Sequence, residues 1–107
     1  MAEDINTNDS LQDDVKLKPK PGLDEPKLYR VIMHNDHYTT MEFVVEVIIK
    51  VFNKPAAEAT KIMLDIHQRG KGVCGVFTFD IAVTKTAAVH QLARKKEFPL
   101  KCSFEEV

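Results

Sequence analysis

The sequence lacks the features that mark several specialised classes of protein. It has no tryptophan, and no apolar run approaches the roughly 20 residues of a membrane span. Lys and Arg number 15 against 16 Asp and Glu, so there is no excess of positive charge and no basic stripe typical of nucleic-acid binding. We therefore expect neither a nucleic acid nor a membrane as a partner.

The first 26 residues contain none of the eight Phe and Tyr residues of the chain. They hold three of its five prolines and seven acidic side chains against three lysines, a net charge of −4. Such a segment cannot bury enough apolar surface to offset the entropy lost on ordering. It is also too acidic and polar for a signal or transit peptide. We predict a disordered N-terminal extension over residues 1–26, one folded domain over 27–107, and a cytoplasmic protein.

Cysteine is nearly absent as well. Cys74 and Cys102 are the only two, and each lies in an apolar run that reads as a strand. Without an export signal, such cysteines are more typical of reduced, buried thiols than of a disulfide.

The remainder of the chain has clear hydrophobic periodicity. Runs rich in β-branched and aromatic residues predict strands, and apolar residues at helical spacing predict helices. The expected strands cover 29–34, 72–78 and 100–104, and the expected helices cover 39–52, 55–69 and 80–96. The first helix should begin with a capping box formed by Thr39 and Glu42. The order β-α-α-β-α-β predicts an α+β domain in which three helices pack on a three-stranded antiparallel sheet.

The same periodicity predicts which helical faces are buried. In the first helix the expected apolar stripe consists of Met41, Val44, Val45, Ile48, Val51 and Phe52. In the third helix the residues expected to point inward are Ile81, Ala88, Val89 and Leu92.

Two polar features stand apart from the core pattern. Asn35 and Asp36 lie in the loop before the first helix, a place where functional groups are often displayed but where Asn and Asp are also favoured by the backbone of a turn. His67 lies on one helical face with Met63 and Ile66. A lone histidine near the end of a helix is usually structural. The spacing alone favours the structural interpretation of both.

Two chemical alternatives can be weighed from the residues. His34, His37, His67 and Cys74 could suggest zinc, but no CxxC or HxxxH pair supports such a site. A Cys–His nucleophilic pair, Cys74 with His67 or His90, lacks a helix N-terminus or an acid that would lower the thiol pKa. We predict no metal, no cofactor and no catalytic residue.

Across the folded region the chain resembles the ClpS adaptor family, from Tyr29 to Cys102 with almost no change in length. The resemblance is carried by several short motifs in the same order. They are Tyr29-Arg30-Val31-Ile32, Asn35-Asp36, Tyr38-Thr39, Met41-Glu42-Phe43-Val44, Ala59-Thr60, Ile62-Met63-Leu64, Ile66-His67, Gly70, Val73-Cys74-Gly75-Val76-Phe77-Thr78, Thr84-Lys85 and Pro99-Leu100.

This resemblance implies a non-enzymatic adaptor that binds N-degrons. These are proteins beginning with Leu, Phe, Tyr or Trp, which the adaptor delivers to a ClpA-type AAA+ unfoldase for degradation. The implied ligands of the substrate α-amine are Asn35 and His67, with Asp36 or a water as a further acceptor. Position 37 usually carries an acid in the family, and here it is His37. The implied walls of the side-chain pocket are Thr39, Met41, Val44, Met63, Ile66 and Leu100.

The resemblance also implies a second surface for the N-domain of the unfoldase, at Asp80 and Lys85. Val83 departs from the acid often found in that segment. A ribosomal-stalk-like interaction domain of similar topology remains an alternative. Such a module, however, has no reason to hold a polar amine site beside an apolar pocket.

Overall fold

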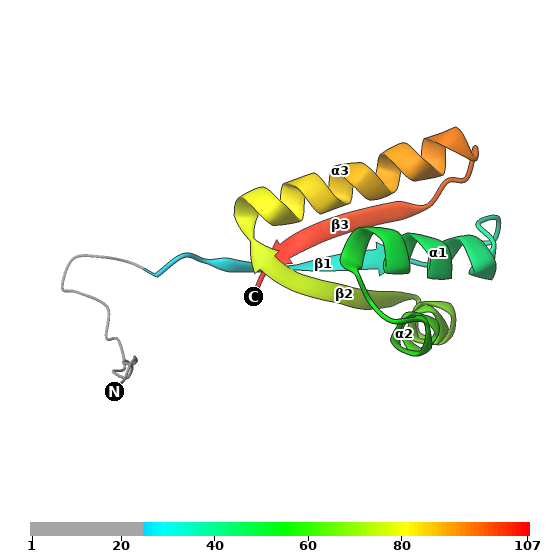
Figure 1. The fold of residues 1–107 in the computed structure, drawn as a ribbon, viewed down its shortest axis with the longest axis horizontal. Helices are drawn as coiled ribbons and strands as arrows, with labels where there is room; N and C mark the ends of the chain where they lie inside the picture. Colours follow the sequence, from blue (N-terminus) through cyan, green and yellow to red (C-terminus); the bar gives the residue numbers. More distant parts are fainter. Residues whose placement is uncertain (1–24) are drawn as a thin grey trace, which may run out of the picture.

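A computed structural model describes residues 25–107. The elements are β1 (Leu28–His34), α1 (Met41–Phe52), α2 (Ala56–Arg69), β2 (Lys71–Thr78), α3 (Phe79–Lys95) and β3 (Lys101–Glu106). β1 is the central strand and pairs antiparallel with both β2 and β3, giving the order β2-β1-β3. The predicted α+β class and order of elements are therefore confirmed (Figure 1). The predicted extension over residues 1–26 falls almost entirely outside the described residues.

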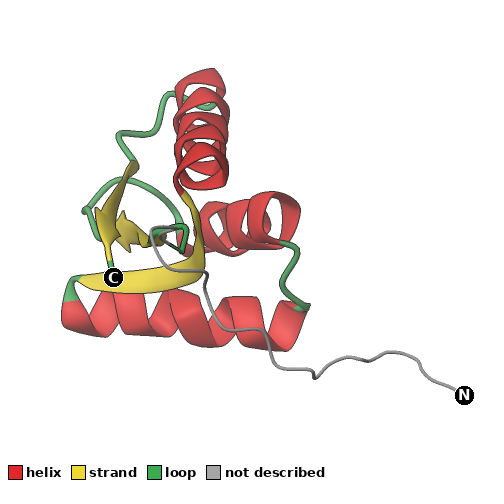
Figure 2. Ribbon diagram, turned by 90° about the vertical axis from the view of Figure 1, so that its left-hand side faces the viewer, coloured by secondary structure: helices red, strands yellow, loops and turns green. Residues whose placement is uncertain are grey.

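The three helices have different relations to the sheet. α1 and α3 run lengthwise across the view of Figure 1, whereas α2 is seen nearly end-on, so α2 lies crosswise to both. The turned view in Figure 2 shows the same crosswise arrangement around the strands. Within residues 25–107, no helix combines the length and the hydropathy of a membrane span.

The prediction for the start of α1 was wrong by one residue. Thr40, not Thr39, is the N-cap: its side-chain oxygen accepts a hydrogen bond from the Phe43 backbone N–H at 3.1 Å. The Thr39 hydroxyl donates instead to the carboxylate of Asp36. Glu42 consequently lies in the first turn rather than in a capping box.

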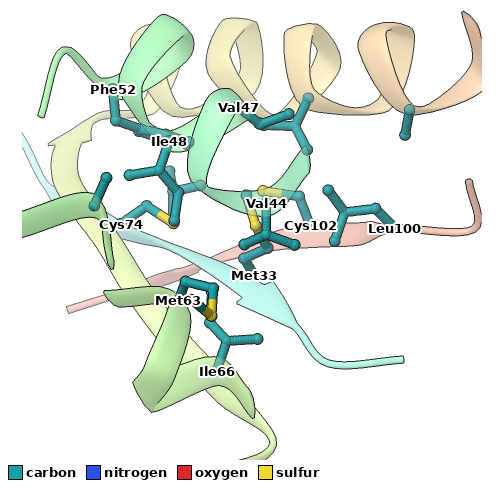
Figure 3. Packing of buried hydrophobic residues seen from close by; sticks show 14 of the residues in the cluster. Met33, Val44, Val47, Ile48, Phe52, Met63, Ile66, Cys74, Leu100 and Cys102 are labelled. Atoms are coloured by element: carbon teal, nitrogen blue, oxygen red, sulfur yellow. The ribbon is translucent and has the colours of Figure 1, made fainter. Parts of the chain in front are cut away.

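The buried face of α1 also differs from the predicted stripe. Phe43 and Val47 are buried with Val44, Ile48 and Phe52, while Met41 is 43% exposed. Nine of the twelve residues in this helix are apolar, so spacing alone could not fix which face turns inward. Figure 3 shows side chains of α1 and α2 converging on Met33 of β1.

The inward face of α3 was predicted in part, since Val89 is buried as predicted and Leu92 packs against the core. Ala82, Thr86, Val89 and Ala93 face the core, whereas Ile81 is 47% exposed. Small residues let the helix approach the sheet closely but contribute little to a hydrophobic pattern, so the larger Ile81 dominated the prediction. Both cysteines are buried free thiols, as predicted.

Candidate functional site

The Asp36 carboxylate forms hydrogen bonds within the loop between β1 and α1 and so fixes its shape. Its Oδ1 accepts hydrogen bonds from the backbone N–H groups of Tyr38 at 2.8 Å and Thr39 at 2.7 Å, and its Oδ2 accepts from the Thr39 hydroxyl at 2.7 Å. Short polar side chains that bond the backbone two and three residues ahead stabilise such turns. The loop therefore has one defined shape, and Oδ2 retains capacity for a further donor.

Two opposing effects act on the pKa of Asp36. Partial burial raises the pKa, but the hydrogen bonds from Thr39 and Tyr38 and the nearby His37 together outweigh burial and lower the pKa below its usual value. The carboxylate is thus ionised at neutral pH and places a negative charge beside the loop.

A backbone contact joins this loop to the end of α2. The Asn35 N–H donates to the Gly70 carbonyl at 2.9 Å, and Gly70 itself ends the helix by donating to the Ile66 carbonyl at 2.9 Å. Gly70 has a φ of 90°, a left-handed conformation that glycine adopts without steric cost. Because His67 lies in the last turn of α2, this contact brings Asn35 and His67 to one place although 32 residues separate them in sequence.

These residues line a pocket of about 590 Å³. Its polar part contains all four predicted amine-site residues: Asn35, Asp36, His37 and His67. Its remaining walls include five of the six predicted apolar-pocket residues: Thr39, Met41, Val44, Met63 and Ile66. Val44, Met63 and Ile66 are buried and form the inner wall, whereas the half-exposed Met41 lies at the rim.

Leu100 is the predicted pocket residue that does not line this cavity. It is buried in the hydrophobic core just before β3. In Figure 3 it lies on the same side of β1 as Val44, which does line the pocket.

Three further residues line the pocket that the sequence analysis did not assign to it: Tyr38, Thr40 and Glu42. The side chain of Tyr38 is largely exposed at the mouth. Glu42 adds a second acidic side chain to the lining of the pocket. All three lie close to Asn35 and Asp36 in sequence, and this proximity could have assigned them to the pocket. The sequence instead predicted a capping box that includes Glu42.

The two residues expected to contact an unfoldase lie on α3, away from this pocket. Asp80 is exposed in the first turn. The Lys85 ammonium donates to the Val51 carbonyl at 2.7 Å and lies 5.4 Å from the centre of the Phe77 ring and 5.8 Å from that of Phe52. Lys85 thus stabilises the C-terminal end of α1 from within the domain.

The arrangement of the thiols argues against nucleophilic chemistry. Burial raises the pKa of Cys74 to about 12, so its thiol is protonated at neutral pH. His90 is engaged elsewhere, because its Nε2 accepts a hydrogen bond from the Cys102 backbone N–H at 3.0 Å. In the described part of the chain, no three His, Cys, Asp or Glu side chains gather as a metal site would need.

The comparisons with known proteins agree with one another. The family model described as "ATP-dependent Clp protease adaptor protein ClpS" matches residues 24–103. A relative from Syntrophus aciditrophicus named "ATP-dependent Clp protease adapter protein ClpS" is 50% identical over the full length of both chains. One of the same name from Acetivibrio thermocellus is 54% identical over 85% of this chain and 92% of its own.

A solved structure resembles the fold as well. It is described as "The structure of Agrobacterium tumefaciens ClpS2 bound to L-phenylalaninamide". It has a TM-score of 0.76 and 36% identity, and the match covers 78% of this chain and all of the other.

Proposed function

The chain belongs to the ClpS family of ATP-dependent Clp protease adaptor proteins, and from that premise we propose that it binds N-degrons and delivers them to a ClpA-type unfoldase. The N-degrons are proteins whose first residue is Leu, Phe, Tyr or Trp. The adaptor carries no proteolytic chemistry of its own in this proposal. The observation that carries it is the pocket of about 590 Å³, in which four polar residues stand beside an apolar wall.

The polar end of the pocket suits a free α-amine. A protein N-terminus is an ammonium with three donors, and its removal from water requires acceptors. The Asn35 side-chain carbonyl and a neutral His67 ring nitrogen supply two acceptors, and Asp36 Oδ2 or a water supplies the third. The negative charges of Asp36 and Glu42 attract the ammonium, whereas His37 adds no negative charge at a position where the family resemblance implies an acid.

The apolar end suits the side chain of the first residue. Val44, Met63 and Ile66 form a buried wall, and the volume falls in the range of small-ligand pockets. The thioether of Met63 can adjust to rings of different size. In this proposal the half-exposed Met41 at the rim contacts the Cβ of the first residue and disfavours a branched side chain.

The ligand of the A. tumefaciens relative supports this assignment. L-Phenylalaninamide has a free α-amine and a benzyl side chain, and its carboxamide stands in for the first peptide bond of a protein. A compound of this kind therefore presents the three groups that the pocket of this chain is proposed to receive.

A calorimetric titration tests the proposal. A peptide beginning with Phe should bind, and its N-acetylated form should bind more weakly by at least about 2 kcal/mol, because Asn35 and His67 are left facing an uncharged amide. His67→Ala should weaken binding of the free peptide. Gln68→Ala, on the same helical turn but not in the pocket, is the matched control and should have no effect. Equal affinity for the free and acetylated peptides would reject N-degron recognition.

A further inference from the structure

A second hollow adjoins the pocket at its rim. It has a volume of about 380 Å³ and is lined by four residues: Met41, Glu42, Val45 and Met63. We call it the outer hollow. Met41, Glu42 and Met63 also line the pocket, so the two cavities meet at these three residues. The outer hollow therefore continues the pocket beyond its rim.

The outer hollow has an apolar floor and one acidic side chain. Met63 is buried, Met41 is half-exposed and Val45 is partly buried. Glu42 is exposed, and in the described part of the chain its carboxylate takes part in no ion pair, whereas Glu46, one turn further along α1, is held in an ion pair at 2.7 Å. Such a surface suits a side chain with an aliphatic stem and a positively charged end, as in Arg or Lys. The stem can cover the apolar residues while the charge stays in water beside the carboxylate.

The distance from the pocket to the outer hollow matches the spacing of an extended peptide. Met41 at the rim and Val45 in the outer hollow are four residues apart on α1, which places them about 6 Å apart along the helix axis. In an extended chain, successive side chains point to opposite sides, and residues two positions apart lie on the same side at a spacing of about 7 Å. When the first side chain of a substrate enters the pocket, the second therefore points away from the protein and the third returns towards it.

We propose that the outer hollow binds the side chain of the third residue of an N-degron and favours Arg or Lys there, with Glu42 as the residue that sets this preference. The inference rests on the proposed function, in which the pocket holds the α-amine and the first side chain. One extended segment then uses both cavities: its first residue decides whether it binds, and its third residue adjusts how tightly. The second residue has little influence, because its side chain points into solvent.

Calorimetric titration of the full chain with two peptides of identical composition tests this inference. One peptide begins Phe-Ser-Arg and the other Phe-Arg-Ser, and the remaining residues are the same, so the two share their net charge and their first residue. The first peptide should have a Kd about fivefold lower, because part of an aliphatic stem covers apolar surface and a solvent-exposed charge pair forms. With Glu in place of Arg the order should reverse, and Phe-Glu-Ser should bind more tightly than Phe-Ser-Glu. Equal Kd values for Phe-Ser-Arg and Phe-Arg-Ser would overturn the inference.

Substitution of Glu42 tests its role as the residue that sets the preference. Glu42→Gln should reduce the advantage of Phe-Ser-Arg over Phe-Arg-Ser to about twofold or less, because the charge pair is lost. Both peptides carry the same α-amine and the same first residue, so their Kd ratio does not respond to a weaker attraction for the ammonium or to a less stable α1. Glu46→Gln makes the same change of charge one turn along α1 and outside both cavities, and as the matched control it should leave the ratio unchanged. A parental ratio in Glu42→Gln would show that Glu42 does not set the preference.

The two proposals fail in different ways. If neither peptide binds more tightly than its N-acetylated form, N-degron recognition fails and the outer hollow loses its ligand with it. If both peptides need their free α-amine but bind with the same Kd, N-degron recognition stands and the site for the third residue is wrong.

Discussion

At the scale of single residues, Asp36 takes the turn role that its spacing favoured. The sequence offered two roles for it, a turn residue or an acceptor for the amine. The structure uses both carboxylate oxygens to hold Tyr38 and Thr39, so the turn role is realised. The position of Asn35 therefore depends on Asp36 even where no ligand is bound. A pattern of residue types could not reveal this, because the same side chain can serve the backbone and a ligand at once.

Replacement of Asp36 should affect stability and binding together. Asp36→Asn retains an acceptor for the backbone N–H groups but loses the charge-assisted bond to the Thr39 hydroxyl, at a cost of about 1–2 kcal/mol at neutral pH. Because folding lowers the pKa of Asp36, its contribution is complete above the ordinary carboxyl pKa and disappears as pH falls through the lowered value.

Urea unfolding at pH 7 and at pH 3 would measure this effect. The difference in unfolding free energy between the variant and the parent should be large at pH 7 and smaller at pH 3. Asp65→Asn, at an exposed position on α2, is the control and should leave the unfolding free energy nearly unchanged. A variant as stable as the parent at pH 7 would show that the loop does not depend on the carboxylate.

At the scale of elements, the order of strands and helices was predictable from the sequence. Which face of each helix is buried was not. Strands such as β1 were identified from β-branched and aromatic residues, and α2 from Pro55 before it and Gly70 after it. The buried faces of α1 and α3 depend instead on tertiary packing. Met41 and Ile81 were both predicted to point inward, but Met41 lies at the rim of the pocket and Ile81 is exposed near the start of α3.

The junction of β2 with α2 offers a prediction about the pocket wall. A Cβ added at Gly72 would lie 2.8 Å from Ile66 Cγ1, and Ile66 lines the pocket. Gly72→Ala should therefore displace Ile66, with a loss of about 1–3 kcal/mol in stability and weaker binding of a Phe-initiated peptide.

A second glycine of β2 provides the matched control. A Cβ at Gly75 would lie 2.5 Å from the ring of Phe77, which does not line the pocket. Gly75→Ala should also lower the unfolding free energy but should leave the peptide Kd unchanged. Should both variants weaken peptide binding equally, the effect would reflect general destabilisation, and Ile66 would not be a specific wall of the pocket.

At the scale of the whole molecule, the pocket and the start of α3 lie at opposite ends of the sheet (Figure 1). The pocket forms where the loop after β1 meets the end of α2, whereas α3 begins beside the start of β1, where Phe79 packs against Tyr29. Sequence reasoning placed nearly all of the pocket residues because the family motifs carry them. It did not predict the exposure of Ile81, because that exposure follows from how α3 packs on the sheet.

An adaptor must bind substrate and unfoldase at the same time, so the most direct measurement is delivery itself. A folded reporter beginning with Phe would be incubated with a ClpA-type unfoldase, its peptidase and ATP, with and without this protein. The reporter should be degraded faster with the adaptor, whereas the same reporter with an acetylated N-terminus should show no gain. His67→Ala should reduce the gain, since it removes a proposed amine acceptor. Degradation of the Phe-initiated reporter at the same rate with and without this protein would contradict the account.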